Sequence, residues 1–107
     1  MRLSEVQKNA IVAAVKEGLN AHGELYLYGS RADDTLKGGD IDLVFITSTV
    51  SNQDLLDLSK KIGQVLVGIK KKIGDQRVDF SIVTVEQSRS DSFWRASLTQ
   101  AVLLSQM

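Results

Sequence analysis

The sequence predicts an α/β (α+β) fold in which a small sheet of three or four strands is flanked by helices. Three observations support this prediction: segments with apolar residues at helical spacing, short runs rich in branched residues, and the alternation of the two along the chain. These patterns leave the direction of the strands open. At 107 residues, the chain is expected to form one domain over residues 1–107.

The first helix is expected between Ser4 and Gly23. Ser4 and Gln7 have the spacing of a capping box, and Gly23 offers a C-terminal stop. The apolar positions in between recur at helical intervals: Val6, Ala10, Ala13 and Ala14. The run from Leu25 to Tyr28 predicts a short strand, and a short helix is possible from Ser30 onwards.

The middle of the chain predicts a buried strand followed by a long helix. Residues 41–46 are dense in branched and aromatic side chains, as in a strand covered on both faces. The helix is expected to begin near Ser51 or Asn52 and to end at Gly74. Its apolar stripe has a spacing of three and four residues: Leu55, Leu58, Ile62, Val65, Ile69 and Ile73.

The last third predicts one strand and one helix. The strand, Arg77 to Val85, alternates between an apolar face and a face that carries Asp79. The helix is expected from about Asp91 to Ser105. An exposed apolar patch near Trp94, closed in an oligomer, is also expected.

The composition excludes several classes of function. Thirteen basic residues balance thirteen acidic ones, so no net field attracts nucleic acid or an anionic membrane, and direct DNA binding is not expected. The absence of cysteine excludes disulfides and thiolate chemistry. No apolar run approaches a membrane span or a signal peptide, so a cytoplasmic location is expected. The single histidine, His22, is expected to face solvent or cap a helix.

Three aspartates form the candidate chemical centre. Asp40 and Asp42 are two residues apart at the start of a strand, so both side chains project from one face. Asp79 lies on the polar face of a later strand. If the two strands are neighbours, the three carboxylates meet, and their repulsion is compensated best by a hard divalent cation such as Mg²⁺. Two such ions would polarise a phosphoryl group and activate a hydroxyl.

The turn Gly29-Ser30 supplies donors for a phosphate. A glycine at a strand end lets backbone N–H groups approach closely, and Arg31 and Lys37 are cations nearby. Taken alone, each feature has an ordinary interpretation: a structural turn, a solvated strand end, an edge acid. Their conjunction favours a site for a nucleoside triphosphate.

That conjunction resembles the nucleotidyltransferase superfamily of the DNA polymerase β type. Its signature is a strand-end Gly-Ser, a spacer of about ten residues, and an Asp-apolar-Asp-apolar strand, here Gly29-Ser30 and Asp40-Ile41-Asp42-Leu43, with Asp79 as the third acid. The resemblance implies the nucleotidyltransferase fold with a small mixed sheet. It also implies that Gly29 and Ser30 hold the terminal phosphates, with Arg31 and Lys37 beside them, and that Asp40, Asp42 and Asp79 bind two Mg²⁺ ions.

The short chain is similar to the minimal nucleotidyltransferases of prokaryotes. These are commonly the antitoxin partners of helical HEPN proteins, and some transfer AMP from ATP onto a tyrosine of the partner. The resemblance therefore implies a hetero-oligomer with ATP as substrate. One departure is that Asp33 and Asp34 follow Ala32, where minimal members often have Arg-Gly. This leaves two alternatives: an antitoxin that masks its partner without chemistry, and transfer of a nucleotide to a small molecule.

Overall fold

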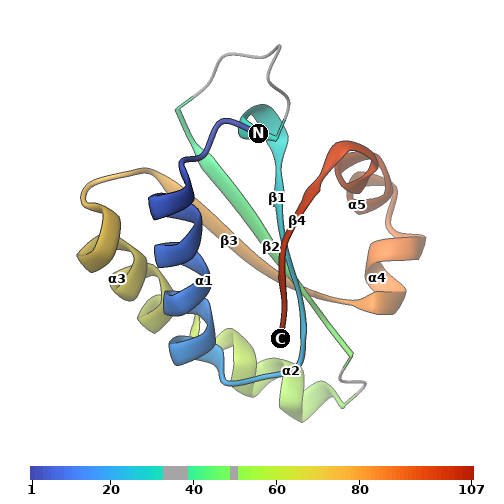
Figure 1. Cartoon of the computed structure of the whole chain (residues 1–107). Helices are drawn as coiled ribbons and strands as arrows, with labels where there is room; N and C mark the ends of the chain where they lie inside the picture. The colour runs from blue at the N-terminus through green and yellow to red at the C-terminus, as the bar shows by residue number, and fades with distance from the viewer. Residues whose placement is uncertain (33–38, 49–50) are drawn as a thin grey trace.

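In the computed structural model, helices cover both faces of a twisted four-stranded sheet (Figure 1). The structure describes residues 1–32, 39–48 and 51–107. The strands are β1 (Gly23–Tyr28), β2 (Ile41–Thr47), β3 (Val78–Thr84) and β4 (Val102–Gln106), in the order β3-β2-β1-β4. β1 is antiparallel to both β2 and β4, whereas β2 and β3 are parallel. The predicted small mixed sheet flanked by helices is confirmed.

Helix α1 (Glu5–Leu19) begins with the predicted capping box. The Ser4 hydroxyl accepts a hydrogen bond from the Gln7 N–H at 3.1 Å, and the Ser4 N–H donates to the Gln7 side chain at 3.2 Å. The predicted stop at Gly23 is wrong. The helix ends at Asn20, which adopts the left-handed conformation at φ 49°, and this leaves Gly23 to begin β1.

The predicted long helix is two helices, α2 (Asn52–Ser59) and α3 (Ile62–Ile73). The break falls at residues 60–61, where the Lys61 ammonium donates to the carbonyl oxygen of Leu19 at 3.2 Å. This turn lets α3 lie along α1, where Gly18 leaves space for Val65. Apolar spacing continues through both helices, so periodicity alone gave no sign of the break.

The predicted last helix, from about Asp91 to Ser105, is wrong over most of its length. The segment forms α5 (Ser92–Ser97), a 3₁₀ turn η2 (Leu98–Gln100) and strand β4, and it is preceded by a short helix that was not predicted, α4 (Val85–Ser90). The Asp91 carboxylate accepts hydrogen bonds from the N–H groups of Phe93 and Trp94 at 2.9 and 3.3 Å, and so starts a new helix. The apolar residues that follow pair with the free edge of β1 instead of continuing the helix.

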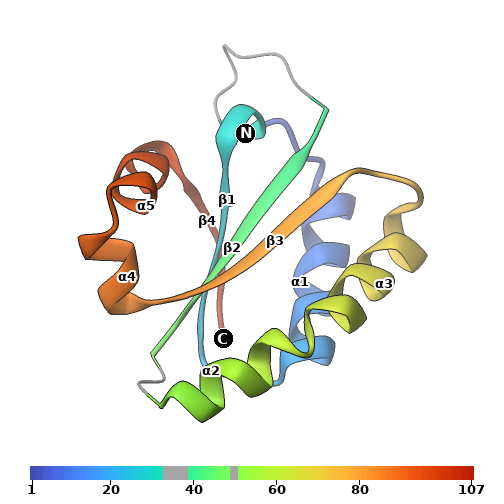
Figure 2. The ribbon, with the colours of Figure 1, turned by 180° about the vertical axis from the view of Figure 1, so that it is seen from behind.

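The two faces of the sheet pack differently (Figures 1 and 2). One face carries the main core with α1, α2 and α3, including the fully buried Leu27, Leu43 and Phe45. The other face carries a small core of Val44, Ile46 and Val83. Four partly buried residues from β1, α5 and η2 pack against this core: Tyr26, Tyr28, Trp94 and Leu98. On this second face, the apolar core does not extend to the start of β2, where the residues are polar.

Candidate active site

Two of the three predicted acids are direct neighbours in the sheet. β2 and β3 run parallel with Asp42 in register with Asp79, so both carboxylates lie on the same face of adjacent strands. Asp40 precedes β2 by one residue and is close enough to act electrostatically on Asp42. The predicted juxtaposition of Asp42 and Asp79 therefore holds, on the face of the sheet that carries α4 and α5.

Gly29 lies against this acid pair because β1 ends beside the start of β2. Tyr28 is in register with Asp42, and Gly29 follows at a φ of +76°, a conformation that favours glycine. A Cβ atom on Gly29 would lie 2.4 Å from the Asp42 Oδ2 atom. Glycine is thus required at this position for two reasons. The backbone conformation favours glycine, and the Asp42 carboxylate occupies the space that a side chain would need.

The segment that follows β1 forms a single turn. Residues Gly29–Arg31 form one 3₁₀ turn, η1, so the expected helix from Ser30 reduces to a single turn and adds little dipole. The turn is bonded to the N-terminal segment: the Arg2 N–H donates to the Arg31 carbonyl oxygen at 2.7 Å, and the Arg2 guanidinium donates to the Ser30 carbonyl oxygen at 3.3 Å.

Arg31 holds segments together at this end of the sheet. Its guanidinium donates to the carbonyl oxygens of Arg2 and Gly39 at 3.2 and 2.9 Å, and to the Gln76 side chain at 3.4 Å. These bonds connect the N-terminus, the residue before Asp40 and the approach to β3. Phosphate contact by Arg31 stays a prediction, and this structural role was not anticipated from the sequence. Lys37, Asp33 and Asp34 lie outside the described residues.

Burial and neighbouring negative charge raise the affinity of Asp42 for a proton. The pKa of Asp42 is raised by burial and by the negative charges of Asp79 and Asp40, in that order. The pKa of Tyr28 is raised by burial and by Asp42 and Asp79, against the opposite effect of a hydrogen bond with Ser81. The site therefore concentrates negative charge that a bound cation would relieve.

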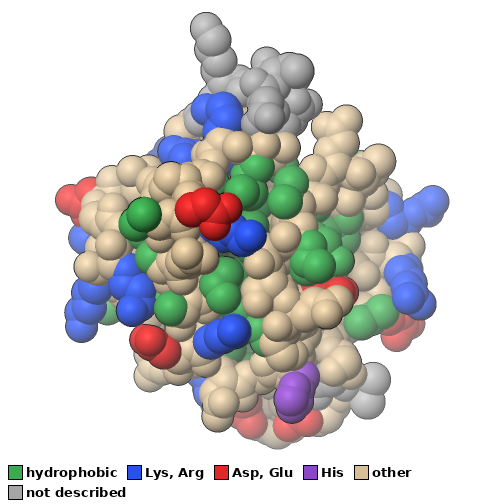
Figure 3. Space-filling model, in the orientation of Figure 1, with side chains coloured by type: hydrophobic (Ala, Val, Ile, Leu, Met, Phe, Trp, Pro, Cys, Tyr) green, Lys and Arg blue, Asp and Glu red, His purple; other side chains and the backbone are tan. Residues whose placement is uncertain are grey.

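Among the described residues, no ion pair compensates this negative charge. On the face shown in Figure 3, basic and acidic side chains are intermixed, as expected for zero net charge. Within the described ranges, the ion pairs join Lys70 to Asp75 at 3.2 Å and Lys72 to Glu17 at 3.7 Å, and none involves the three acids.

The carboxylates suit Mg²⁺ by their chemistry, since hard cations prefer oxygen ligands. The carboxylates do not form a complete metal site by themselves. In the part of the chain that the structure describes, no group of three or more His, Cys, Asp or Glu side chains is placed to hold a metal ion. The adjacent Asp42 and Asp79, with their mutual repulsion, are the residues that fit a cation best.

A cavity of about 340 Å³ adjoins this centre. One wall is formed by residues 28–30 at the end of β1 and by η1. The other comes from α5 and η2, through Phe93, Ala96, Ser97 and Gln100. Sequence reasoning missed these four residues because it placed them in a long helix with no relation to the Gly-Ser turn. Phe93, next to Trp94, is 58% exposed, and the expected apolar patch that closes in an oligomer stays a prediction.

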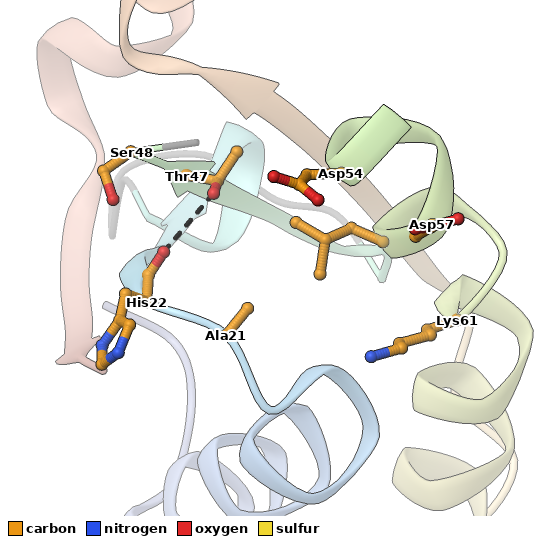
Figure 4. A pocket seen from close by; sticks show the side chains of 8 residues that line it. Ala21, His22, Thr47, Ser48, Asp54, Asp57 and Lys61 are labelled. Atoms are coloured by element: carbon orange, nitrogen blue, oxygen red, sulfur yellow. Dashed lines mark hydrogen bonds between the residues drawn. The ribbon is translucent and has the colours of Figure 1, made fainter. Parts of the chain in front are cut away.

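A second cavity, of about 470 Å³, lies at the opposite end of β2 (Figure 4). Its walls include His22, Thr47, Asp54, Asp57 and Lys61, and the Thr47 hydroxyl donates to the His22 carbonyl oxygen at 3.4 Å. His22 is exposed, as expected. β2 separates this cavity from the three acids by roughly 20 Å.

A mixed sheet that brings a Gly-Ser turn against Asp42 on β2, a strand that begins directly after Asp40, is typical of nucleotidyltransferase folds. The family model of the nucleotidyltransferase domain matches residues 8–95, and the chain belongs to this family. It is therefore an enzyme of the nucleotidyltransferase type.

Two solved structures share the fold. One is a candidate nucleotidyltransferase from Sulfolobus solfataricus, with a TM-score of 0.61 and 20% identity, covering 95% of this chain and 78% of that one. The other is a toxin-antitoxin structure with AMP-PNP, with a TM-score of 0.55 and 21% identity, covering 94% of this chain and 73% of that one. No curated protein matches the sequence significantly. Within the described residues, no helix is long and apolar enough to cross a membrane.

Proposed function

We propose that this protein is a Mg²⁺-dependent nucleotidyltransferase that transfers AMP from ATP to a hydroxyl of a partner protein. We further propose that it is the antitoxin of a pair whose other member is a helical HEPN-type protein. The observation that carries the proposal is the contact between Gly29 and Asp42, with Asp79 in register beside them. This contact supports the proposal, because a turn that would bind phosphate lies against acids that would bind metal.

Each residue has a role in this reaction. Gly29 and Ser30 bind the terminal phosphates through backbone N–H groups that no side chain obstructs at Gly29. Asp40, Asp42 and Asp79 would hold Mg²⁺, which when bound neutralises and orients the triphosphate. The acceptor oxygen forms a bond to the α-phosphorus while the bond to pyrophosphate breaks. Asp79, the exposed member of the pair, accepts the hydroxyl proton and releases it to solvent.

The partner proposal is supported by likeness of fold alone. A neighbour with a similar fold is a toxin-antitoxin assembly that contains AMP-PNP. That protein thus combines a nucleotide analogue with a partner chain, and we propose the same combination here. A cytoplasmic location belongs to the same proposal.

The test is incubation with ATP labelled at the α-phosphate, Mg²⁺ and the product of the neighbouring open reading frame, which we expect to be the helical partner. We expect label on the partner, and we expect Asp42→Asn to abolish the transfer. Asp57→Asn is the matched control, because this exposed acid lies at the other end of β2 and should leave transfer unchanged. The catalytic proposal fails if no label transfers and Asp42→Asn still neutralises the partner.

A second candidate is an antitoxin that masks its partner without chemistry. It is favoured by Asp33 and Asp34, two anions that follow the Gly-Ser turn in the sequence and would weaken the binding of a triphosphate. Calorimetry separates the two, because a masking protein has no need to bind ATP with Mg²⁺. Transfer to a small molecule remains a third alternative, distinguished by label appearing on a small product.

A further inference from the structure

The cavity between η1 and α5 is continuous with the proposed phosphate site. Gly29 and Ser30 form part of its wall, and these are the residues proposed to hold the triphosphate. A triphosphate bound there has its nucleoside within reach of the same cavity. At about 340 Å³ the cavity is at the small end of the range for ligand sites, which suits one base with its sugar better than a peptide.

An aromatic row leads from the acids into this cavity. Tyr28, in register with Asp42, meets Trp94 with ring centroids 5.2 Å apart and planes at 74°. Trp94 in turn meets Phe93 at 4.9 Å and 77°. These edge-to-face contacts fix the orientation of each ring by the one before it.

Phe93 ends the row with its ring largely exposed. It is the one aromatic residue among the large apolar side chains that are exposed in the described ranges, at 58%. Its backbone is held by Asp91, whose carboxylate accepts the Phe93 N–H at 2.9 Å. A fixed, exposed aromatic ring on a cavity wall offers a flat surface for stacking and loses little conformational entropy when a ligand binds.

The remaining wall favours a polar heterocycle over an apolar partner helix. Ser97 and Gln100 line the cavity beside Phe93 and Ala96, so polar and apolar groups alternate there. The Gln100 amide offers both donors and an acceptor, as the edge of a nucleobase requires. An apolar helix would leave these groups without partners.

We infer that this cavity binds the nucleoside of the triphosphate, with the base stacked on Phe93. The inference rests on the proposed function and adds the nucleoside subsite to it. Phe93 thereby contributes to affinity for ATP and contributes nothing to affinity for the phosphates alone.

The experiment compares ATP with inorganic tripolyphosphate, each in the presence of Mg²⁺, by calorimetry. Trp94, the single tryptophan of the chain, contacts Phe93, so its fluorescence provides a second readout. We expect Phe93→Ala to weaken ATP binding about tenfold and to leave tripolyphosphate binding unchanged. Phe93→Tyr should restore ATP binding, because it retains the ring.

Val67→Ala is the matched control: this apolar residue on α3 is 54% exposed and lies away from the cavity, so neither affinity should change. Equal binding of ATP by wild type and Phe93→Ala overturns the inference, as does equal affinity of the wild type for ATP and tripolyphosphate. Both results leave the phosphate site in place. Failure of the wild type to bind either ligand overturns the inference and the proposed function together.

Discussion

Replacing Gly29 with alanine tests whether the phosphate turn and the metal acids form one unit. The φ of +76° costs a non-glycine residue about 1–2 kcal/mol. The new Cβ atom would also lie 2.4 Å from the Asp42 Oδ2 atom, whereas ordinary contact begins at 3.4 Å. The carboxylate must therefore move by about 1 Å, the difference between these two distances.

The two costs are expected to appear in different assays. Backbone strain lowers the free energy of unfolding by about 1–2 kcal/mol, seen as a fall in Tm of roughly 5–10 °C. Displacement of the Asp42 carboxylate by about 1 Å is expected to reduce nucleotide transfer about 100-fold, because positioning dominates such reactions.

Gly74→Ala is the matched control for strain. Gly74 has a φ of +84°, and a Cβ atom there would meet nothing within 4 Å. This variant should lose stability but keep full transfer activity. Gly63→Ala, in α3 and also without contacts, should be slightly stabilised. If Gly29→Ala behaves as Gly74→Ala does in both assays, the turn and Asp42 are not coupled, and the reasoning is refuted.

Three further predictions concern the charges and the caps. The pKa of Asp42 is raised in the folded state, so its ionisation destabilises the protein as the pH rises above the ordinary value of 3.8. Asp42→Asn should therefore be more stable than wild type at pH 7, by roughly 0.5–1 kcal/mol in denaturant unfolding, with the difference vanishing below pH 3.8; equal stability at both pH values would contradict this. Arg31→Ala removes three hydrogen bonds and should lower the unfolding free energy by about 1–3 kcal/mol, whereas a change below 0.5 kcal/mol would show that these bonds do not hold the turn. Thr84→Ala removes the capping box of α4 and should cost about 1 kcal/mol in the same assay without changing transfer, so lost transfer at full stability would contradict its role as a cap.

The parts of the fold that sequence predicted are those with strong local signals. The capping box at Ser4 and the dense apolar run of β2 each specify one structure. The break at residues 60–61 and strand β4 could not be predicted in this way. Both depend on tertiary partners, namely the end of α1 for Lys61 and the free edge of β1 for β4.

The candidate site, like the fold, could be predicted from the sequence only in part. Period-two alternation was enough to place Asp40 and Asp42 on one face and Asp79 on a polar face. It could not show that Asp42 and Asp79 are in register, because register is set by packing across the sheet. Nor could it bring α5 to the Gly-Ser turn, since Phe93 reaches that cavity only through the unpredicted path of α4, α5 and β4.

The proposed active site binds ATP through Mg²⁺ that is held by the acids beside Gly29. The most direct test of this binding is the ratio of ATP affinities measured with and without Mg²⁺ by calorimetry, for wild type and for the double variant Asp42→Asn, Asp79→Asn. The ratio isolates the metal, because the double variant also removes charges that repel the triphosphate. We predict a large ratio for wild type and a ratio near one for the variant. The same large ratio in both proteins would contradict this mode of binding.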